Sequence, residues 1–236
     1  MPYRLLDQFR RTFEGREYRH RSSNQGDMVA IEFYEDLLVL DPTSLYSRRV
    51  TARTRVVSGR NTRRGITARR GDGTFGELIP NTPPAQEPNF GVWRGEIATV
   101  EIGIETKIFS KAMVKQWGRV ASDLTDQLAH FRRGGGTPIC VAVVGVNHAA
   151  RYTSFEKDRV FATDGSGTYR HPAQEAPEIE RRLDAFIRPI FDELIVLRYE
   201  ATNEPPYLFR WVDESANERD YGAALTRVLR RYDARA

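Results

Sequence analysis

Glu105 and Lys107 are the residues whose types and spacing most clearly suggest chemistry. Both lie in "GEIATVEIGIETKIF" (95–109), a largely apolar and β-branched run that predicts a strand. Alternate residues of a strand share a face, so the two side chains lie about 7 Å apart along one face and can reach a common point. A carboxylate at that point binds a hard cation such as Mg²⁺, and an ammonium positions or deprotonates a nearby water. The pair therefore suggests metal-assisted hydrolysis of a phosphodiester.

The same alternation assigns the other residues of this strand to two faces. Glu101 and Gly103 are predicted to share the polar face with Glu105 and Lys107, and an apolar face is predicted to contain Val100, Ile102, Ile104, Thr106 and Ile108. A half-exposed strand with a solvated polar face is the simplest alternative explanation. An apolar helix and an apolar strand follow directly, which favours a position inside a sheet.

Hydrophobic periodicity predicts the elements that position this strand. Helices are expected at 3–14, 27–40, 111–132, 177–191 and 217–234, the fourth with Phe186 on its apolar face and ended or kinked by Pro189. Strands are expected at 137–146, 193–202 and 207–213, and a hairpin at 66–80 that turns at Gly71-Asp72-Gly73. These elements predict a single α/β domain over residues 1–236, with a mixed sheet flanked by helices and helix-hairpin-helix elements at 175–234.

The order of these elements resembles a known family. Glu105-Thr106-Lys107 at the end of an apolar strand, followed by a long helix and another apolar strand, resembles the (D/E)xK half of the PD-(D/E)xK nuclease superfamily. The resemblance covers about residues 27–147. It implies a restriction-endonuclease-like core, Mg²⁺ or Mn²⁺ as cofactor, and catalysis by Glu105 and Lys107.

The resemblance also implies a second metal-binding acid, which is an Asp, often after Pro, on the preceding strand. No Pro-Asp pair occurs in residues 70–100, and the candidates there are Asp72, Glu77, Glu87, Glu96 and Glu101. Glu77 is the preferred catalytic and metal-binding partner of Glu105, because the second strand of the predicted hairpin can pair beside 97–109. Asp72 and Glu96 are kept as reserves, whereas Glu101 lies roughly 13 Å along the strand from Glu105.

Helices contribute further candidates. Glu32, Glu35 or Asp36 of the helix at 27–40 could supply another acid, although a solvated helix face explains them more simply. Gln116 or Gln127 of the helix at 111–132 could orient the scissile phosphate, and a solvated face explains these two residues equally well.

An arginine-rich segment indicates a nucleic-acid partner. Residues 42–71 contain nine Arg and no acid, although the net charge of the whole chain is only +4. Such a segment fits the phosphate backbone of double-stranded DNA, and arginine can also read guanine in the major groove. The alternative is a surface loop in an arginine-biased proteome. The predicted DNA contacts are Arg48, Arg49, Arg53, Arg55, Arg60, Arg63, Arg64, Arg69, Arg70, Lys111 and Lys115.

Composition excludes several other classes. Cys140 is the single cysteine, so the chain has no internal disulfide and suits a reducing cytoplasm. No apolar run approaches eighteen residues and no secretory signal is visible, so we expect a cytoplasmic protein without a membrane partner. The GxGxxG match at 71–76 lacks the helix that a dinucleotide site needs, and "RRGGGTP" lacks the lysine of a P-loop.

The sequence therefore predicts a Mg²⁺-dependent DNA endonuclease, of the type II restriction or defence class. Cutting both strands requires two active sites, so a homodimer is expected. Two alternatives stay open. One is a non-catalytic nucleic-acid-binding protein with a degenerate nuclease fold. The other is an α/β interaction protein in which Glu105 and Lys107 form only a surface pair.

Overall fold

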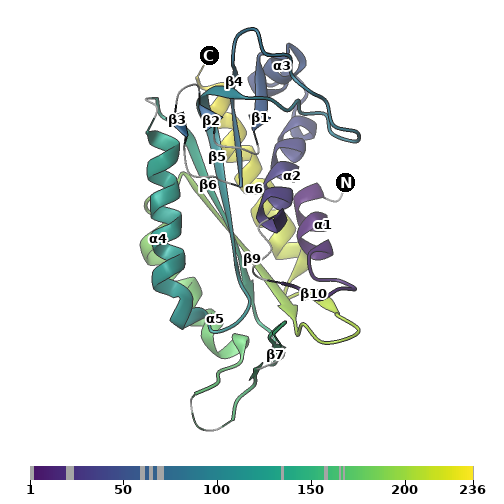
Figure 1. Ribbon diagram of the computed structural model, residues 1–236, viewed down its shortest axis with the longest axis vertical. Coiled ribbons are helices and arrows are strands. Elements are labelled where there is room, and N and C mark those ends of the chain that lie inside the picture. The colour runs from purple at the N-terminus through teal and green to yellow at the C-terminus, as the bar shows by residue number, and fades with distance from the viewer. Residues whose placement is uncertain are drawn as a thin grey trace.

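The computed structural model describes residues 3–19, 24–58, 62–63, 66–67, 72–133, 136–156, 159–164, 166 and 168–235. Its centre is a mixed six-stranded sheet of order β1-β4-β5-β6-β9-β10, which is strongly twisted (Figure 1). The strands are β1 (Arg55–Ser58), β4 (Gly73–Leu78), β5 (Ile97–Phe109), β6 (Ile139–Asn147), β9 (Glu193–Ala201) and β10 (Phe209–Trp211). The three central strands β5, β6 and β9 are parallel, and the pairings β1–β4, β4–β5 and β9–β10 are antiparallel. Two small ladders pair β2 (Thr62–Arg63) with β3 (Ile66–Thr67) and β7 (Tyr152–Thr153) with β8 (Val160–Phe161).

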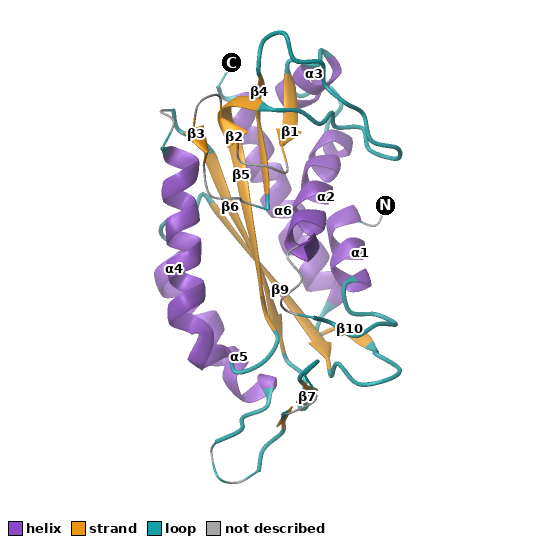
Figure 2. Ribbon diagram, viewed as in Figure 1, coloured by secondary structure: helices purple, strands orange, loops and turns teal. Residues whose placement is uncertain are grey.

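Helices cover both faces of the large sheet (Figure 2). One face packs against α1 (Arg4–Arg11), α2 (Asn24–Leu40), α3 (Leu45–Thr51) and α6 (Glu214–Asp233). The opposite face packs against α4 (Met113–Arg132) and α5 (Pro172–Arg182), which continues as a π-helical turn (Leu183–Ile187). Burial on both faces explains why every residue of β6 is buried and why its sequence is a continuous apolar run.

Several predictions from the sequence are confirmed. The mixed sheet flanked by helices is observed, β5 spans 97–109, and α4 and β6 lie within two residues of their predicted bounds. The apolar stripe of α4 faces the sheet as its periodicity predicts, and includes Val120, Leu124, Leu128 and Phe131.

Other predictions are wrong. Residues 66–80 do not form one hairpin, because β3 pairs with β2 while β4 pairs with β1 and β5. The arginine-rich segment begins with helix α3, which was not predicted because the segment shows no firm hydrophobic period. Phe186 is 59% exposed instead of buried, because α5 gives way to a π-helical turn there and the faces rotate.

A β-bulge changes the predicted faces of β5. Phe75 pairs with Ile102 and Gly76 with Val100, so Glu101 is an extra residue on β5. Val100 consequently packs on the α4 side, whereas Ile102 packs on the α6 side. Glu101 points away from α4 and accepts hydrogen bonds from Arg49 and from the Tyr232 hydroxyl of α6. Glu101 therefore does not share a face with Glu105.

None of the helices within the described residues combines the length and the apolar character needed to cross a bilayer.

Candidate active site

Glu105 and Lys107 lie where β5 extends beyond its antiparallel neighbour. The ladder between β4 and β5 ends at the pair of Gly73 with Ile104, and the parallel ladder to β6 continues to Phe109. Residues 105–107 are thus paired with β6 along one backbone edge, whereas β4 does not pair with their other edge. A site on a central strand is positioned more rigidly than a site on a loop.

Glu105 is buried beside Lys107. The side chain is 5% exposed, and its Oε1 accepts a hydrogen bond from Lys107 Nζ at 2.6 Å. Burial and then repulsion from Asp72 raise the pKa of Glu105 from 4.5 to about 8, although Lys107 acts in the opposite direction. The second oxygen, Oε2, is buried and has no hydrogen-bond partner among the residues that the structure describes.

Lys107 is held in its cationic form. Burial alone disfavours the charged ammonium, but the carboxylates of Glu105 and Asp72 outweigh burial and raise the pKa of Lys107 above its ordinary value. A lysine held in this state does not remove a proton from water near neutral pH. It contributes positive charge and hydrogen-bond donors instead.

Asp72 is the acid that the fold brings to this pair. It immediately precedes Gly73, which pairs with Ile104, so it comes opposite Glu105 across the open edge of β5. Its Oδ2 accepts a hydrogen bond from the backbone N–H of Thr106 at 2.7 Å, at the point where a longer β4 would continue the ladder. The negative charge of Asp72 contributes to the raised pKa of Glu105, which fits carboxylates that lie close together.

Helix α2 fixes the position of Asp72. The Tyr34 hydroxyl donates to Ile102 O at 3.1 Å and lies 3.3 Å from Gly73 O, so it joins the helix to both strands beside the site. In the first turn of α2, a Cβ added to Gly26 would lie 2.7 Å from Asp72 Oδ2, so only glycine allows this approach. The sequence interpretation missed both residues. A glycine in the first turn of an otherwise regular helix was the available signal.

Glu77, the preferred partner acid, is placed elsewhere. It pairs with Thr99 on β5, six residues before Glu105, and it is exposed near Arg55. Its strand does pair beside β5 as expected, but the register places Glu77 opposite Thr99 and brings Asp72, which was kept as a reserve, next to Glu105. Glu96 is exposed just before β5, and Glu87 forms an ion pair with Arg94 at 3.3 Å. Neither of these two acids faces the site.

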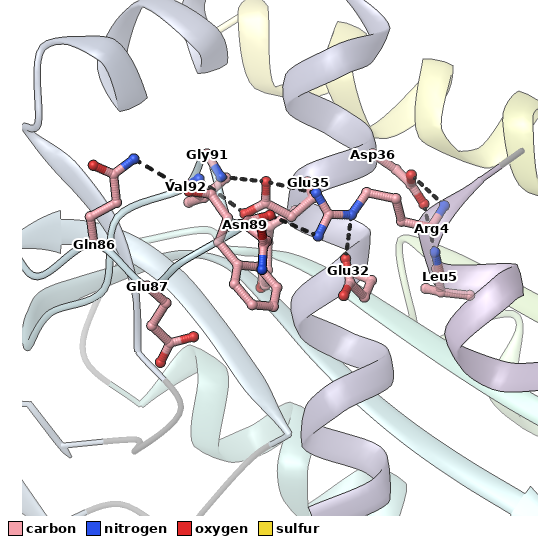
Figure 3. Close-up of polar contacts among 12 residues, drawn as sticks. Arg4, Leu5, Glu32, Glu35, Asp36, Gln86, Glu87, Asn89, Gly91 and Val92 are labelled. Carbon is pink, nitrogen blue, oxygen red and sulfur yellow. Dashed lines mark hydrogen bonds and ion pairs between the residues drawn. The ribbon is translucent and has the colours of Figure 1, made fainter. Parts of the chain in front are cut away.

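The acids of α2 have structural partners (Figure 3). Glu35 accepts hydrogen bonds from the backbone N–H groups of Gly91 and Val92 at 2.8 and 2.9 Å. Asp36 accepts from the backbone of α1 and from the Tyr221 hydroxyl, and Glu32 forms an ion pair with Arg4 at 2.6 Å. These contacts join α2 to α1, α6 and the loop before β5, and they account for all three carboxylates.

The predicted DNA-binding arginines differ in their surroundings. Arg48 is exposed, and Arg53 lies over the Trp93 ring at 4.2 Å. Arg49 and Arg55 both bind Glu101, and Arg63 belongs to β2, which contacts β5. Arg60, Arg64, Arg69 and Arg70 lie outside the described residues.

The two lysines after β5 differ from one another. Lys115 is exposed on α4. Lys111 donates hydrogen bonds to Ser154 Oγ and to Glu156 Oε2, so it joins the end of β5 to the segment that follows β7.

The donor set fits a hard divalent cation. Asp72 and Glu105 supply carboxylate oxygens, and Glu105 Oε2 is the buried oxygen without a described partner. No group of three or more His, Cys, Asp or Glu side chains is placed to hold a metal ion in the described part of the chain. Two carboxylates are sufficient for Mg²⁺, which usually completes its coordination with waters and substrate phosphates.

Comparisons with protein-family models, with curated proteins and with solved structures gave no match.

Proposed function

We propose that this protein is a Mg²⁺-dependent endonuclease that hydrolyses phosphodiester bonds in DNA. The observation that carries the proposal is the convergence of Asp72, Glu105 and Lys107 at the open edge of β5. The three residues have the types and the order of a PD-(D/E)xK site, with Gly71 where that pattern often has Pro. The sheet order β1-β4-β5-β6, with α4 between the parallel strands β5 and β6, supports a restriction-endonuclease-like core.

The roles follow from the environment of each group. Asp72 and Glu105 would hold the cation, which when bound polarises a phosphodiester and lowers the pKa of a bound water. Glu105 gives up its proton when its oxygens are used as ligands, because coordination requires a deprotonated carboxylate. Lys107, which stays cationic, stabilises negative charge next to Glu105 and orients an attacking water through its remaining N–H donors.

Double-stranded DNA is the proposed substrate because a basic segment accompanies the site. The ladder of β2 and β3 lies within the arginine-rich residues 42–71 and contacts β5, the strand that carries Glu105. Cationic side chains of this segment would bind the phosphate backbone with a strong dependence on salt. The proposal includes a homodimer, since cleavage of both strands requires two sites.

A plasmid-nicking assay with Mg²⁺ or Mn²⁺ tests the proposal, with Asp72→Asn and Glu77→Gln as a matched pair. Each substitution neutralises one acid, Asp72 just before the start of β4 and Glu77 near its end. Only Asp72 lies opposite Glu105. We expect Asp72→Asn and Glu105→Gln to abolish cleavage and Glu77→Gln to preserve it. Loss of cleavage in Glu77→Gln together with normal cleavage by Asp72→Asn would contradict this site.

One observation favours a second candidate, a DNA-binding protein without catalytic activity. Lys107 is committed to Glu105 in a 2.6 Å ion pair, which is an arrangement that a purely structural pair would also adopt. Salt-dependent binding of duplex DNA, with no cleavage in either metal, would favour this candidate. Absence of both binding and cleavage at low salt would reject both nucleic-acid functions.

A further inference from the structure

Helix α4 lies directly over the face of β5 that carries Glu105. The chain leaves β5 at Phe109 and begins α4 at Met113, so the helix runs back along the strand in the opposite direction (Figure 1). The two elements are in tight contact at Gly103, where an added Cβ would lie 2.6 Å from the ring of Phe131. This contact fixes the alignment of the helix with the strand.

From that contact, two residues of β5 and four residues of α4 cover nearly the same distance. Two residues of a strand advance about 6.7 Å, and four residues of a helix advance about 6.0 Å. Moving from Gly103 to Glu105 therefore corresponds to moving from Phe131 to Gln127. The next step places Asp123 over Lys107, and the negative charge of Asp123 does contribute to the raised pKa of Lys107. Gln127 thus lies over Glu105.

Gln127 and Glu105 each have a buried polar atom for which the described residues supply no hydrogen-bond partner. Gln127 is 3% exposed, and its Nε2 has no hydrogen-bond partner among the described residues. Glu105 Oε2 also has no hydrogen-bond partner among the described residues. One atom is a donor and the other an acceptor, yet they do not bond to each other. A buried amide with a purely structural role would be expected to be paired, because an unpaired buried donor destabilises the fold.

We propose that Gln127 is a phosphate-binding residue of this site. Its Nε2 donates a hydrogen bond to a non-bridging oxygen of the phosphodiester, while the oxygens of Glu105 hold the cation that the same phosphate binds. A neutral amide suits this position, because it donates to an anion without altering the charges of Asp72, Glu105 and Lys107. This inference rests on the proposed nuclease function.

The test compares Gln127→Met with Gln116→Met in the full-length protein. Gln116 lies on the same helix, and its Nε2 donates to Lys111 O at 2.7 Å, so its hydrogen bond is structural. We expect Gln127→Met to lower kcat/KM for plasmid cleavage by about 10- to 100-fold, which corresponds to one lost hydrogen bond to a charged oxygen. In EDTA its unfolding temperature should stay unchanged or rise, because an unpaired buried amide is removed. Gln116→Met should show the reverse pattern, with cleavage kept and the unfolding temperature lowered.

The outcomes separate the two proposals. Cleavage by Gln127→Met at the wild-type rate overturns the phosphate-binding role and leaves the nuclease function standing. An unfolding temperature of Gln127→Met below that of Gln116→Met assigns a structural role and also overturns the inference. If the wild type does not cleave, the nuclease function fails, and binding of a short duplex in Ca²⁺ then decides the role of Gln127. Weaker binding by Gln127→Met supports the phosphate contact, and equal binding, including none by either protein, overturns it.

Discussion

Replacing Glu105 with glutamine should stabilise the metal-free protein at alkaline pH and have progressively less stabilising effect as the pH falls. The pKa of Glu105 is raised from 4.5 to about 8 by burial and by the charge of Asp72. Between these two values the folded protein keeps the proton on Glu105, whereas the unfolded chain releases it. The folded state therefore binds more protons, and its stability falls as the pH rises through this window. Glutamine has nearly the same shape and does not titrate.

The size of the effect follows from the shift in pKa. Each pH unit between about 4.5 and 8 changes the stability difference by about 1.4 kcal/mol. The advantage of Glu105→Gln over the wild type should therefore grow by up to about 5 kcal/mol across the window and level off above pH 8. Titrating groups distant from Glu105 contribute equally to both proteins and cancel in the difference, whereas Asp72 and Lys107 interact with Glu105 and form part of the measured effect.

Urea denaturation in EDTA, from pH 4 to pH 9, measures this difference directly. Glu77→Gln controls for the chemical change, because that side chain is exposed on the neighbouring strand. The competing outcome has a clear cause, since Lys107 lies 2.6 Å from Glu105 and favours the carboxylate. If the advantage of glutamine shrinks as the pH rises, the ion pair outweighs burial and repulsion, and the reasoning about Glu105 is refuted.

Three further substitutions test how the site is built. Gly26→Ala should move the Asp72 carboxylate, which lies 2.7 Å from the added Cβ. Cleavage should be abolished, while the free energy of unfolding in urea stays within about 1 kcal/mol of the wild type, and normal cleavage would contradict the close approach. Gly103→Ala should cost about 1–3 kcal/mol by overpacking against Phe131, and adding Phe131→Leu should restore part of this loss; a cost that Phe131→Leu leaves unchanged would point to another cause. Glu35→Ala should cost about 2 kcal/mol, because two backbone N–H groups lose their acceptor, and a loss below 0.5 kcal/mol would show that they find another.

Local pattern predicted the central elements, because burial determines both pattern and structure there. β5 and β6 are β-branched runs, and α4 has an apolar stripe with helical spacing, so each has a single reasonable interpretation. The pair Glu105 and Lys107 was found for the same reason, since two residues on one strand face need no knowledge of any other strand.

The partner acid could not be chosen among its candidates in this way, because the choice of Asp72 over Glu77 depends on the register of strand pairing. A regular ladder would keep Glu101 on the face of Glu105, but the bulge opposite Gly76 changes the register by one residue. The bulge itself had a signal in the sequence. A Cβ on Gly76 would lie 1.8 Å from Thr99 O, and a glycine inside a strand often marks such a feature. Its effect on Asp72 required the partner strand to be known.

The site therefore consists of two parts, the pair on β5 and the acid before β4, that can be disrupted separately. Glu105 and Lys107 are fixed by β5 and β6, which are buried on both faces, so their positions should persist as long as the protein folds. Asp72 lies just before β4, where its contacts include the hydrogen bond from Thr106 and the close approach of Gly26 in α2. Small movements of α2 would remove the second carboxylate while the core stayed intact. Under the proposed function, such a movement would remove metal binding while the fold and the proposed DNA contacts persisted, and this order would distinguish an inactivated site from an unfolded protein.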